Sequence, residues 1–165
     1  MTGTPRLALP FLSAGQVQKE TTVNESLQLL DFLAAAAVAE PPRNDPPTSP
    51  DVGECFIVGP APTSVWAGWA GSLAGYTAGG WRQIPAVPGM RVYVQSIDQW
   101  ACYRAGAWEL GAVRGAKLII EGQQVVGPRA AAIASPAAGT NVDAEARAVI
   151  EQILVALRAH GLVAA

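Results

Sequence analysis

The sequence has one histidine, two cysteines and little charge, and each shortage excludes a class of chemistry. Because His160 is the one imidazole and Cys55 and Cys102 lie far apart, neither a zinc site of the usual spacing nor a Ser-His-Asp triad is expected. Charged residues make up 15% of the chain and the net charge is −2, which argues against nucleic acid as a partner. No apolar run approaches the roughly 20 residues of a transmembrane helix, so we expect no membrane partner.

Two weaker routes to chemistry remain. Asp98 and Glu109 could form a carboxylate pair, but charged residues at strand ends are normally solvated. The glycines between positions 68 and 80 lack the Gly-Lys-Ser/Thr ending of a phosphate-binding loop. We therefore predict a non-enzymatic protein with no catalytic residue, no metal site and no cofactor. The two cysteines are expected to be small buried thiols, although the sequence leaves a disulfide open.

A repeat occupies the middle of the chain. The pattern Tyr-x-Ala-Gly-x-Trp occurs at residues 76–81 and again at 103–108. A glycine can take a positive φ without steric cost, so each copy predicts a hairpin turn with Tyr and Trp facing across two strands. Aromatic and β-branched residues predict further strands at 56–58, 92–94 and 118–120. Such small units bury little surface alone, so they must stack or be covered.

The rest of the chain predicts an α+β protein. An extended segment is followed by a helix from Ser13 or Gly15 that ends by Glu40, because Pro41 and Pro42 follow. Five prolines between Pro41 and Pro50 predict a stiff linker. The expected regions are an extended arm plus helix (1–40), a Pro-rich linker (41–51), a repeated antiparallel β module (52–127), an Ala/Pro-rich connector (128–142) and a C-terminal amphipathic helix (143–162).

The C-terminal helix is predicted to lie between Asp143 as N-cap and Gly161 as its stop. Its apolar residues follow a seam that is typical of a short coiled coil. We therefore predict a homo-oligomer interface at Ile150, Ile153 and Leu157. Packing of this helix on its own chain is the alternative, and the pattern favours neither.

The N-terminal arm carries apolar side chains on a segment that two prolines keep from becoming a helix. Exposed apolar strips are usually covered, so we predict docking on a neighbouring subunit or another partner protein. The docking residues are Leu7, Leu9, Phe11 and Leu12. The alternative is that the arm covers the open face of its own β module.

Aromatic residues are concentrated in the β module. Those at repeated positions are expected to fill its core. Trp66, Trp69 and Trp100 break the repeat and are expected to be exposed, where flat rings could stack on sugars. They are the candidate glycan-binding residues.

Three segments together form a pattern that resembles a known protein family. The first is Arg6 to Lys19 with Asn24-Glu25, the second is Gly53–Val58 leading to Trp66-Ala67-Gly68 and residues 76–81, and the third is Val142 to Leu162. The pattern is similar to a domain-of-unknown-function family found among head-spike and tail-fibre proteins of alphaproteobacterial phages and gene transfer agents. One departure is Val23, where that family carries a histidine. The resemblance implies a structural component of a phage-like particle, made in the bacterial cytoplasm, that attaches to the capsid or a neighbouring particle protein. It also implies contact with cell-surface polysaccharide as an alternative role.

Overall fold

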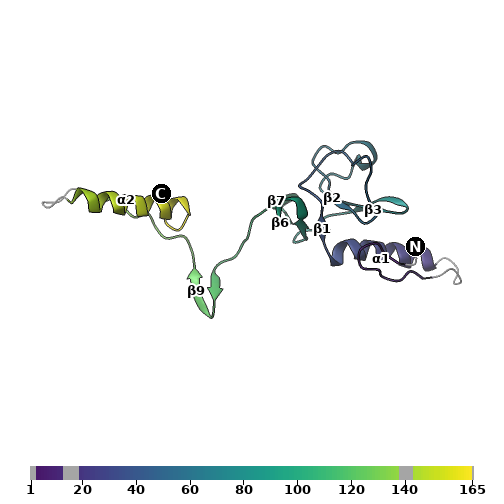
Figure 1. Cartoon of the computed structure of the whole chain (residues 1–165), viewed down its shortest axis with the longest axis horizontal. Helices are drawn as coiled ribbons and strands as arrows, with labels where there is room; N and C mark the ends of the chain where they lie inside the picture. The colour runs from purple at the N-terminus through teal and green to yellow at the C-terminus, as the bar shows by residue number, and fades with distance from the viewer. Residues whose placement is uncertain (1–2, 13–18, 138–142, 165) are drawn as a thin grey trace. The chain divides into compact units, whose positions relative to one another are not determined.

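The computed structural model describes residues 3–12, 19–137 and 143–164. It divides the chain into two compact units, residues 1–112 and 113–165, and each is described by itself. The fold is α+β as predicted, with an N-terminal helix, small antiparallel sheets and a C-terminal helix (Figure 1). The boundary between the units falls inside the range 52–127 that the sequence assigns to one β module.

The N-terminal unit builds two sheets. One has the strand order β1-β5-β6-β7, with β1 parallel to β5 and the other pairs antiparallel, and the second is the antiparallel sheet β2-β3-β4. The elements are α1 (Lys19–Ala34), β1 (Ala37–Val38), β2 (Cys55–Ile57), β3 (Leu73–Thr77), β4 (Gly80–Ile84), β5 (Arg91–Val94), β6 (Gln99–Arg104) and β7 (Ala107–Leu110), with 3-10 turns at Ser64–Trp66 and Gln95–Ile97.

One core joins the helix and both sheets. Phe32 of α1 packs with buried residues of β1, β2, β3, β4, β5 and β6. Strand β2 is buried at all three positions because its two faces meet different layers. Cys55 and Ile57 face this core, whereas Phe56 faces an aromatic cluster with Val58 and Trp66. Side chains alternate across a strand, which is why a three-residue apolar run serves two layers.

Gly75 of β3 allows the helix to approach the sheet closely. A Cβ at this position would lie 2.6 Å from the ring of Phe32, nearer than real side chains come. The glycine therefore forms part of the fit between α1 and the sheet.

The predicted helix is too long at its C-terminal end. It ends at Ala34, and Ala37 and Val38 form a strand that pairs with Tyr93 and Val94 of β5. The burial of the β-branched Val38 in the core outweighs the helical tendency of the neighbouring alanines. The predicted helix start at Ser13 or Gly15 lies outside the described residues.

The segment between Pro41 and Pro50 is extended but is not a free linker. Arg43 pairs with Val58 in a parallel bridge, and its N–H donates to the carbonyl of Ile57 at 3.1 Å. Asn44 accepts from the backbone N–H groups of Thr63 and Ala61, through its carbonyl and its side chain respectively. The prediction of a linker is wrong because the prolines leave enough backbone donors and acceptors to continue the β2 sheet edge.

The repeat is confirmed in three dimensions. Tyr76 pairs with Trp81 across β3 and β4, and Tyr103 pairs with Trp108 across β6 and β7. Their ring centroids lie 4.9 Å and 5.3 Å apart, with interplanar angles of 57° and 58°. The two copies are therefore hairpins with the same pairing, in which a Tyr–Trp pair stabilises the end next to the turn.

The C-terminal unit contains a hairpin of β8 (Leu118–Ile120) and β9 (Gln123–Val126), and the helix α2 (Ala144–Ala159). Asp143 caps the helix, since its side chain accepts from the N–H of Ala146 at 2.8 Å, and Gly161 follows it with φ +71°. Both ends of the helix were predicted. Within the described part of 128–142, Ala130 forms a parallel bridge with Val163, so this connector packs beside the end of the helix.

Candidate assembly and binding surfaces

The N-terminal arm is held against α1 by one buried carboxylate. Asp31 accepts hydrogen bonds from the hydroxyl of Thr4 at 2.7 Å and from the N–H groups of Arg6 at 2.9 Å and Leu7 at 2.6 Å. The guanidinium of Arg6 donates to the carbonyls of Phe32 and Ala37, where the helix gives way to β1. We call this arrangement the Asp31 clasp. It gives the arm a place on its own chain.

The four predicted docking residues divide into two pairs. Leu7 and Leu12 are exposed, whereas Leu9 and Phe11 are half-buried. The clasp fixes the arm to its own helix, and the arm also touches the β module, since a Cβ on Gly53 would meet the side chains of Pro5 and Arg6 at 3.3 Å and 3.5 Å. Leu7 and Leu12 stay exposed and can contact another protein. Docking on a partner stays a prediction.

The structure separates the three tryptophans that the sequence groups together. Trp66 has 0% exposure and packs between Phe56 and Trp81, so the prediction that it is exposed is wrong. It fills the core because the 3-10 turn at Ser64–Trp66 points it inward beneath the β2-β3-β4 sheet. Trp69 is half-buried against the same cluster, and Trp100 on β6 is 57% exposed.

Trp100 belongs to a surface platform. Its ring meets Tyr93 on the neighbouring strand at a centroid distance of 5.6 Å and an angle of 65°. The hydroxyl of Tyr93 donates to a carboxylate oxygen of Asp98 in a short hydrogen bond. This bond and the nearby negative charge raise the pKa of Tyr93 above its usual value. The platform thus joins an exposed aromatic face to a carboxylate acceptor, a combination that suits a ring bearing hydroxyl groups.

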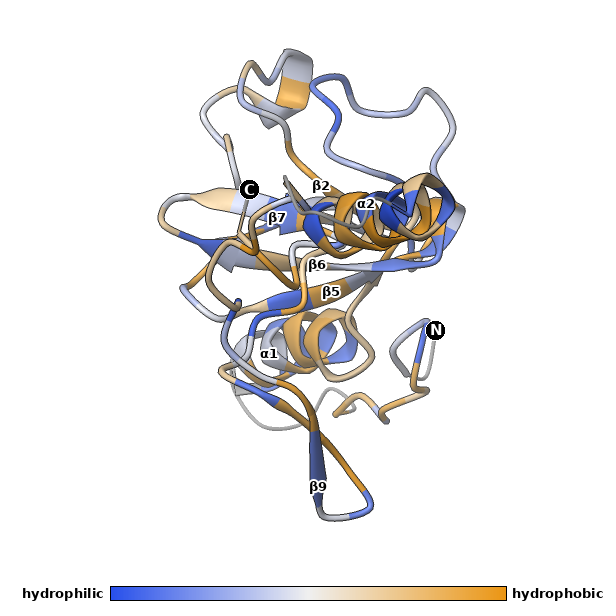
Figure 2. Ribbon diagram, turned by 90° about the vertical axis from the view of Figure 1, so that its left-hand side faces the viewer, coloured by the Kyte–Doolittle hydropathy of each residue, from blue (hydrophilic) through white to orange (hydrophobic). Residues whose placement is uncertain are grey.

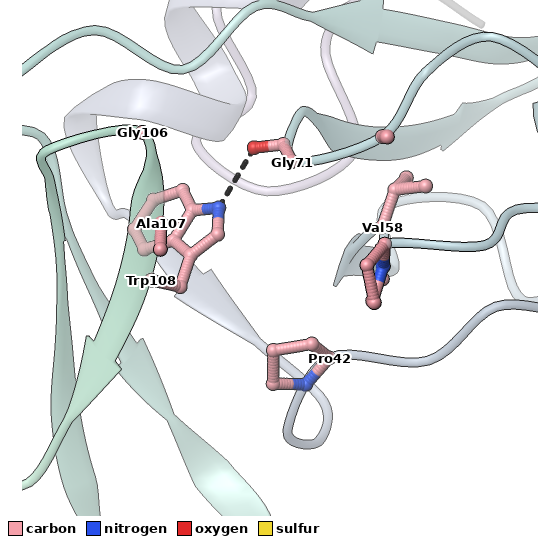
Figure 3. A pocket seen from close by; sticks show the side chains of 9 residues that line it. Pro42, Val58, Gly71, Gly106, Ala107 and Trp108 are labelled. Carbon is pink, nitrogen blue, oxygen red and sulfur yellow. Dashed lines mark hydrogen bonds between the residues drawn. The ribbon is translucent and has the colours of Figure 1, made fainter.

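Trp108 of the second hairpin lies beside a shallow apolar groove. The groove has a volume of about 350 Å³, and its walls come from segments far apart in the sequence, including Pro42, Val58 and Gly71. The indole N–H of Trp108 donates to the carbonyl of Gly71 at 2.8 Å, which fixes the ring (Figure 3). With its donor used, Trp108 presents only apolar surface to a ligand.

The C-terminal unit leaves most of its apolar side chains in solvent. Leu154 and Val163 are its buried apolar residues within the described part of the chain. Helix α2 is amphipathic, and hydrophobic residues also occur in the hairpin that contains β9 (Figure 2). The exposed apolar residues are Val113, Leu118, Ile119, Ile120, Val125, Val126, Ile133, Val149, Ile150, Ile153, Val155 and Leu162.

The predicted interface residues lie next to the buried side of α2. Ile150 and Ile153 are exposed, and Leu157 is half-buried. Leu154 faces its own chain, so α2 packs on its own unit along one side and keeps a second apolar stripe open. The helix can thus pack on its own chain and also contact a second copy, so the two alternatives do not exclude each other. The homo-oligomer interface itself stays a prediction.

Residues 23–109 match the model of a family described as a protein of unknown function, DUF2793. The match covers more than half of the chain. The chain belongs to the DUF2793 family. Membership of a domain-of-unknown-function family was predicted from the sequence. No curated protein matches the chain.

The DUF2793 region runs from α1 to β7 and contains the aromatic platform, the groove and Asp31. The donors of the Asp31 clasp and the whole C-terminal unit lie outside the matched residues. The aromatic platform and the groove therefore belong to the part of the chain that matches the family, whereas the N-terminal arm and the C-terminal unit flank it.

Groups that could support catalysis or metal binding are sparse. Among the described residues, no cluster of three His, Cys, Asp or Glu side chains could hold a metal ion. Cys55 and Cys102 are free thiols, and burial raises the pKa of Cys55 to about 12, which keeps it protonated and unreactive. No helix in the described ranges has the length and apolarity needed to cross a membrane.

Proposed function

We propose that this DUF2793 protein is a non-enzymatic structural component of a phage-like particle. It attaches to the capsid or to a neighbouring particle protein and associates with further copies of itself. The virion or particle is the proposed location. The resemblance of the sequence to head-spike and tail-fibre proteins supports the particle, and the exposed surfaces support assembly.

The observation that carries the proposal is the open apolar stripe of α2. Ile153 is 53% exposed on a helix that already buries Leu154 against its own unit. Soluble proteins usually cover such stripes, and an amphipathic helix with a second apolar side is suited to helix–helix association. Burial of these side chains between copies would contribute about 1.5–3 kcal/mol for each one fully covered.

Ile153→Asp tests the proposal. Placing a carboxylate in the stripe should lower the mass measured by light scattering, because burying an unpaired charge is strongly unfavourable. Val155→Asp is a matched control, since Val155 is 55% exposed and lies about 160° around the helix from position 153. The same mass for parent and Ile153→Asp, with both folded, would refute association through this stripe. Locating the protein in a cryo-EM map of the parent particle tests the particle itself.

A second candidate function is recognition of cell-surface polysaccharide. The platform of Trp100, Tyr93 and Asp98 favours it, because an exposed ring and an adjacent acceptor match the chemistry of sugars. Trp100→Ala should abolish glycan-array binding, while Trp100→Phe should retain part of it. Binding that is unchanged in Trp100→Ala, or absent in the parent, would exclude this platform.

A further inference from the structure

The β8–β9 hairpin is incomplete as an isolated structure. It is a two-stranded sheet, and every residue of both strands is exposed. An isolated two-stranded hairpin is only marginally stable in water. Both outer edges also offer backbone groups to a further strand. We therefore expect the hairpin to pair with a further strand. The strand residues themselves are uncharged, so that partner must pack against an uncharged surface.

The turn determines which backbone groups are available. Glu121 and Gly122 have φ of +49° and +77°, as in a two-residue type I′ turn, and Ile120 pairs with Gln123 beside it. In such a turn the flanking residues bond to each other, so the N–H and C=O of Ile120 face β9. Those of Ile119 then face the open edge of β8. A neighbouring strand can therefore pair with β8 through the backbone groups of Ile119.

The charges at the ends of β8 select the partner. Lys117 precedes the strand and Glu121 follows it, and both are exposed. In the described part of the chain, neither one forms an ion pair. If a second copy of β8 runs antiparallel with Ile119 opposite Ile119, each Lys117 lies opposite Glu121 of the second copy. The same register pairs Leu118 with Ile120 and aligns the available backbone groups of Ile119.

We propose that two copies of the chain join edge to edge through β8, in antiparallel register centred on Ile119. The product is a four-stranded sheet, β9-β8-β8-β9, with two Lys117–Glu121 pairs across the two-fold axis. Lys117 and Glu121 lie two residues before and two residues after Ile119. Two antiparallel copies of this edge therefore match each other in charge and in backbone donors and acceptors, as an interface with a two-fold axis requires. The other edge carries no such pattern, because β9 is Gln123–Val126 and has no charged residue.

The faces of the joined sheet are consistent with this arrangement. Cross-strand partners share a face, so Leu118 and Ile120 lie on one face with Val126 and Gln123, and Ile119 lies on the other with Gln124. The register of the pairing shifts between Leu118 and Ile119. Lys117 and Glu121 flank the strand at its two ends and are both exposed, so an ion pair between copies would stay in contact with water. Joining two hairpins doubles the aliphatic face and gives four strands, which meets the minimum for a stable sheet.

The pairing through β8 rests on the proposed function, because it would be one contact of the proposed self-association. A separate set of variants tests the pairing by itself. Lys117→Glu and Glu121→Lys should each raise the dissociation constant of the full chain by about tenfold, ~1.4 kcal/mol, since two attractive pairs become repulsive. The double variant Lys117→Glu/Glu121→Lys should restore parental affinity. An equimolar mixture of the two single variants should associate more tightly than either one alone.

Sedimentation of the parent and variants at low salt measures these affinities. A monomeric parent, a double variant as weak as the single ones, or a mixture no tighter than its components would overturn the inference. If the parent associates and only Ile153→Asp disrupts it, the hairpin pairing is excluded while the proposed assembly role stands. Covering of the hairpin by the chain's own N-terminal unit would give the monomeric outcome.

Cross-linking checks the register independently. In a Cys102→Ser background, Ile119→Cys places one thiol opposite its own copy, so mild oxidation should give a disulfide-linked dimer. Gln124→Cys is the control, because it lies on the same face but on β9, away from the axis. Failure of Ile119→Cys to cross-link, or equal cross-linking of both variants, would contradict a register centred on Ile119.

Discussion

Asp31 is fully buried, and its two carboxylate oxygens accept three hydrogen bonds from the N-terminal arm. Replacing one oxygen by an amide NH2 would place a donor against a donor. Each buried group left without a partner costs about 1–3 kcal/mol. Asp31→Asn should therefore lower the free energy of unfolding by about 2–4 kcal/mol in urea titration.

The control is Asp51→Asn, at an exposed position, which should change stability by less than about 0.5 kcal/mol. Equal stabilities of Asp31→Asn and the parent would show that the arm is not held by the clasp.

Cys55 makes a pH prediction possible at the same scale. Burial raises its pKa from 9.0 to about 12, so the folded state holds the thiol proton more tightly than the unfolded state. Its contribution to stability is complete below pH 9 and is lost as pH rises towards 12, at about 1.4 kcal/mol per pH unit. Cys55→Ala should show a shallower alkaline loss than the parent.

Reaction with a thiol reagent at pH 8 provides a second check. Cys102 is half-buried and should react in the folded protein, whereas Cys55 should react only on unfolding. Rapid modification of both thiols in the folded state would contradict the burial of Cys55.

At the scale of elements, the two repeated hairpins share pairing but differ in their turns. The second turn has positive φ at Ala105 and Gly106, whereas in the first turn the left-handed residue is Gly80 and not Gly79. Gly106→Ala should therefore cost about 1 kcal/mol or more in urea titration, because a Cβ is strained at φ +84°.

Gly79→Ala is the matched control, because position 79 lies outside the left-handed region. A Cβ there would meet the end of the flexible Arg82 side chain at 3.1 Å, so the cost should be small. Equal losses from both substitutions would mean that the two turns are alike.

Local patterns predicted elements better than they predicted burial. The Tyr-x-Ala-Gly-x-Trp repeat fixed two hairpins because turn chemistry and cross-strand pairing act within six residues. The end of α1 was missed because Val38 joins β5, a partner more than 50 residues away in the sequence. Trp66 was misplaced for a similar reason, since its surroundings come from β2 and β4 and no sequence period reports them.

The same limit applies to the candidate surfaces. The stripe on α2 and the exposure of Trp100 were predicted, because helical period and departure from a repeat are local signals. The bonds to Asp31 join positions 24 to 27 residues apart and gave no signal in the sequence. The groove beside Trp108 likewise needs Gly71 and Pro42, which only the folded chain brings together.

At the scale of the whole molecule, the division into two units predicts separable behaviour. A fragment of residues 1–112 keeps the core shared by α1 and both sheets. It should unfold cooperatively near the melting temperature of the full chain, because the C-terminal unit contributes no residue to that core. The fragment should also lose self-association. A melting temperature many degrees lower would show that the two units stabilise each other.

All five tryptophans, and every tyrosine and phenylalanine, precede residue 113, so the C-terminal unit has no aromatic side chain. Near-ultraviolet aromatic absorbance and tryptophan emission of the intact protein thus arise wholly from the N-terminal unit. Emission from Trp66 should be blue-shifted and that from Trp100 red-shifted, in line with their burial and exposure. Self-association through α2 or β8 should leave this emission spectrum unchanged while the mass of the assembly rises. A rise in mass without a spectral change would therefore indicate that the copies meet through the C-terminal unit.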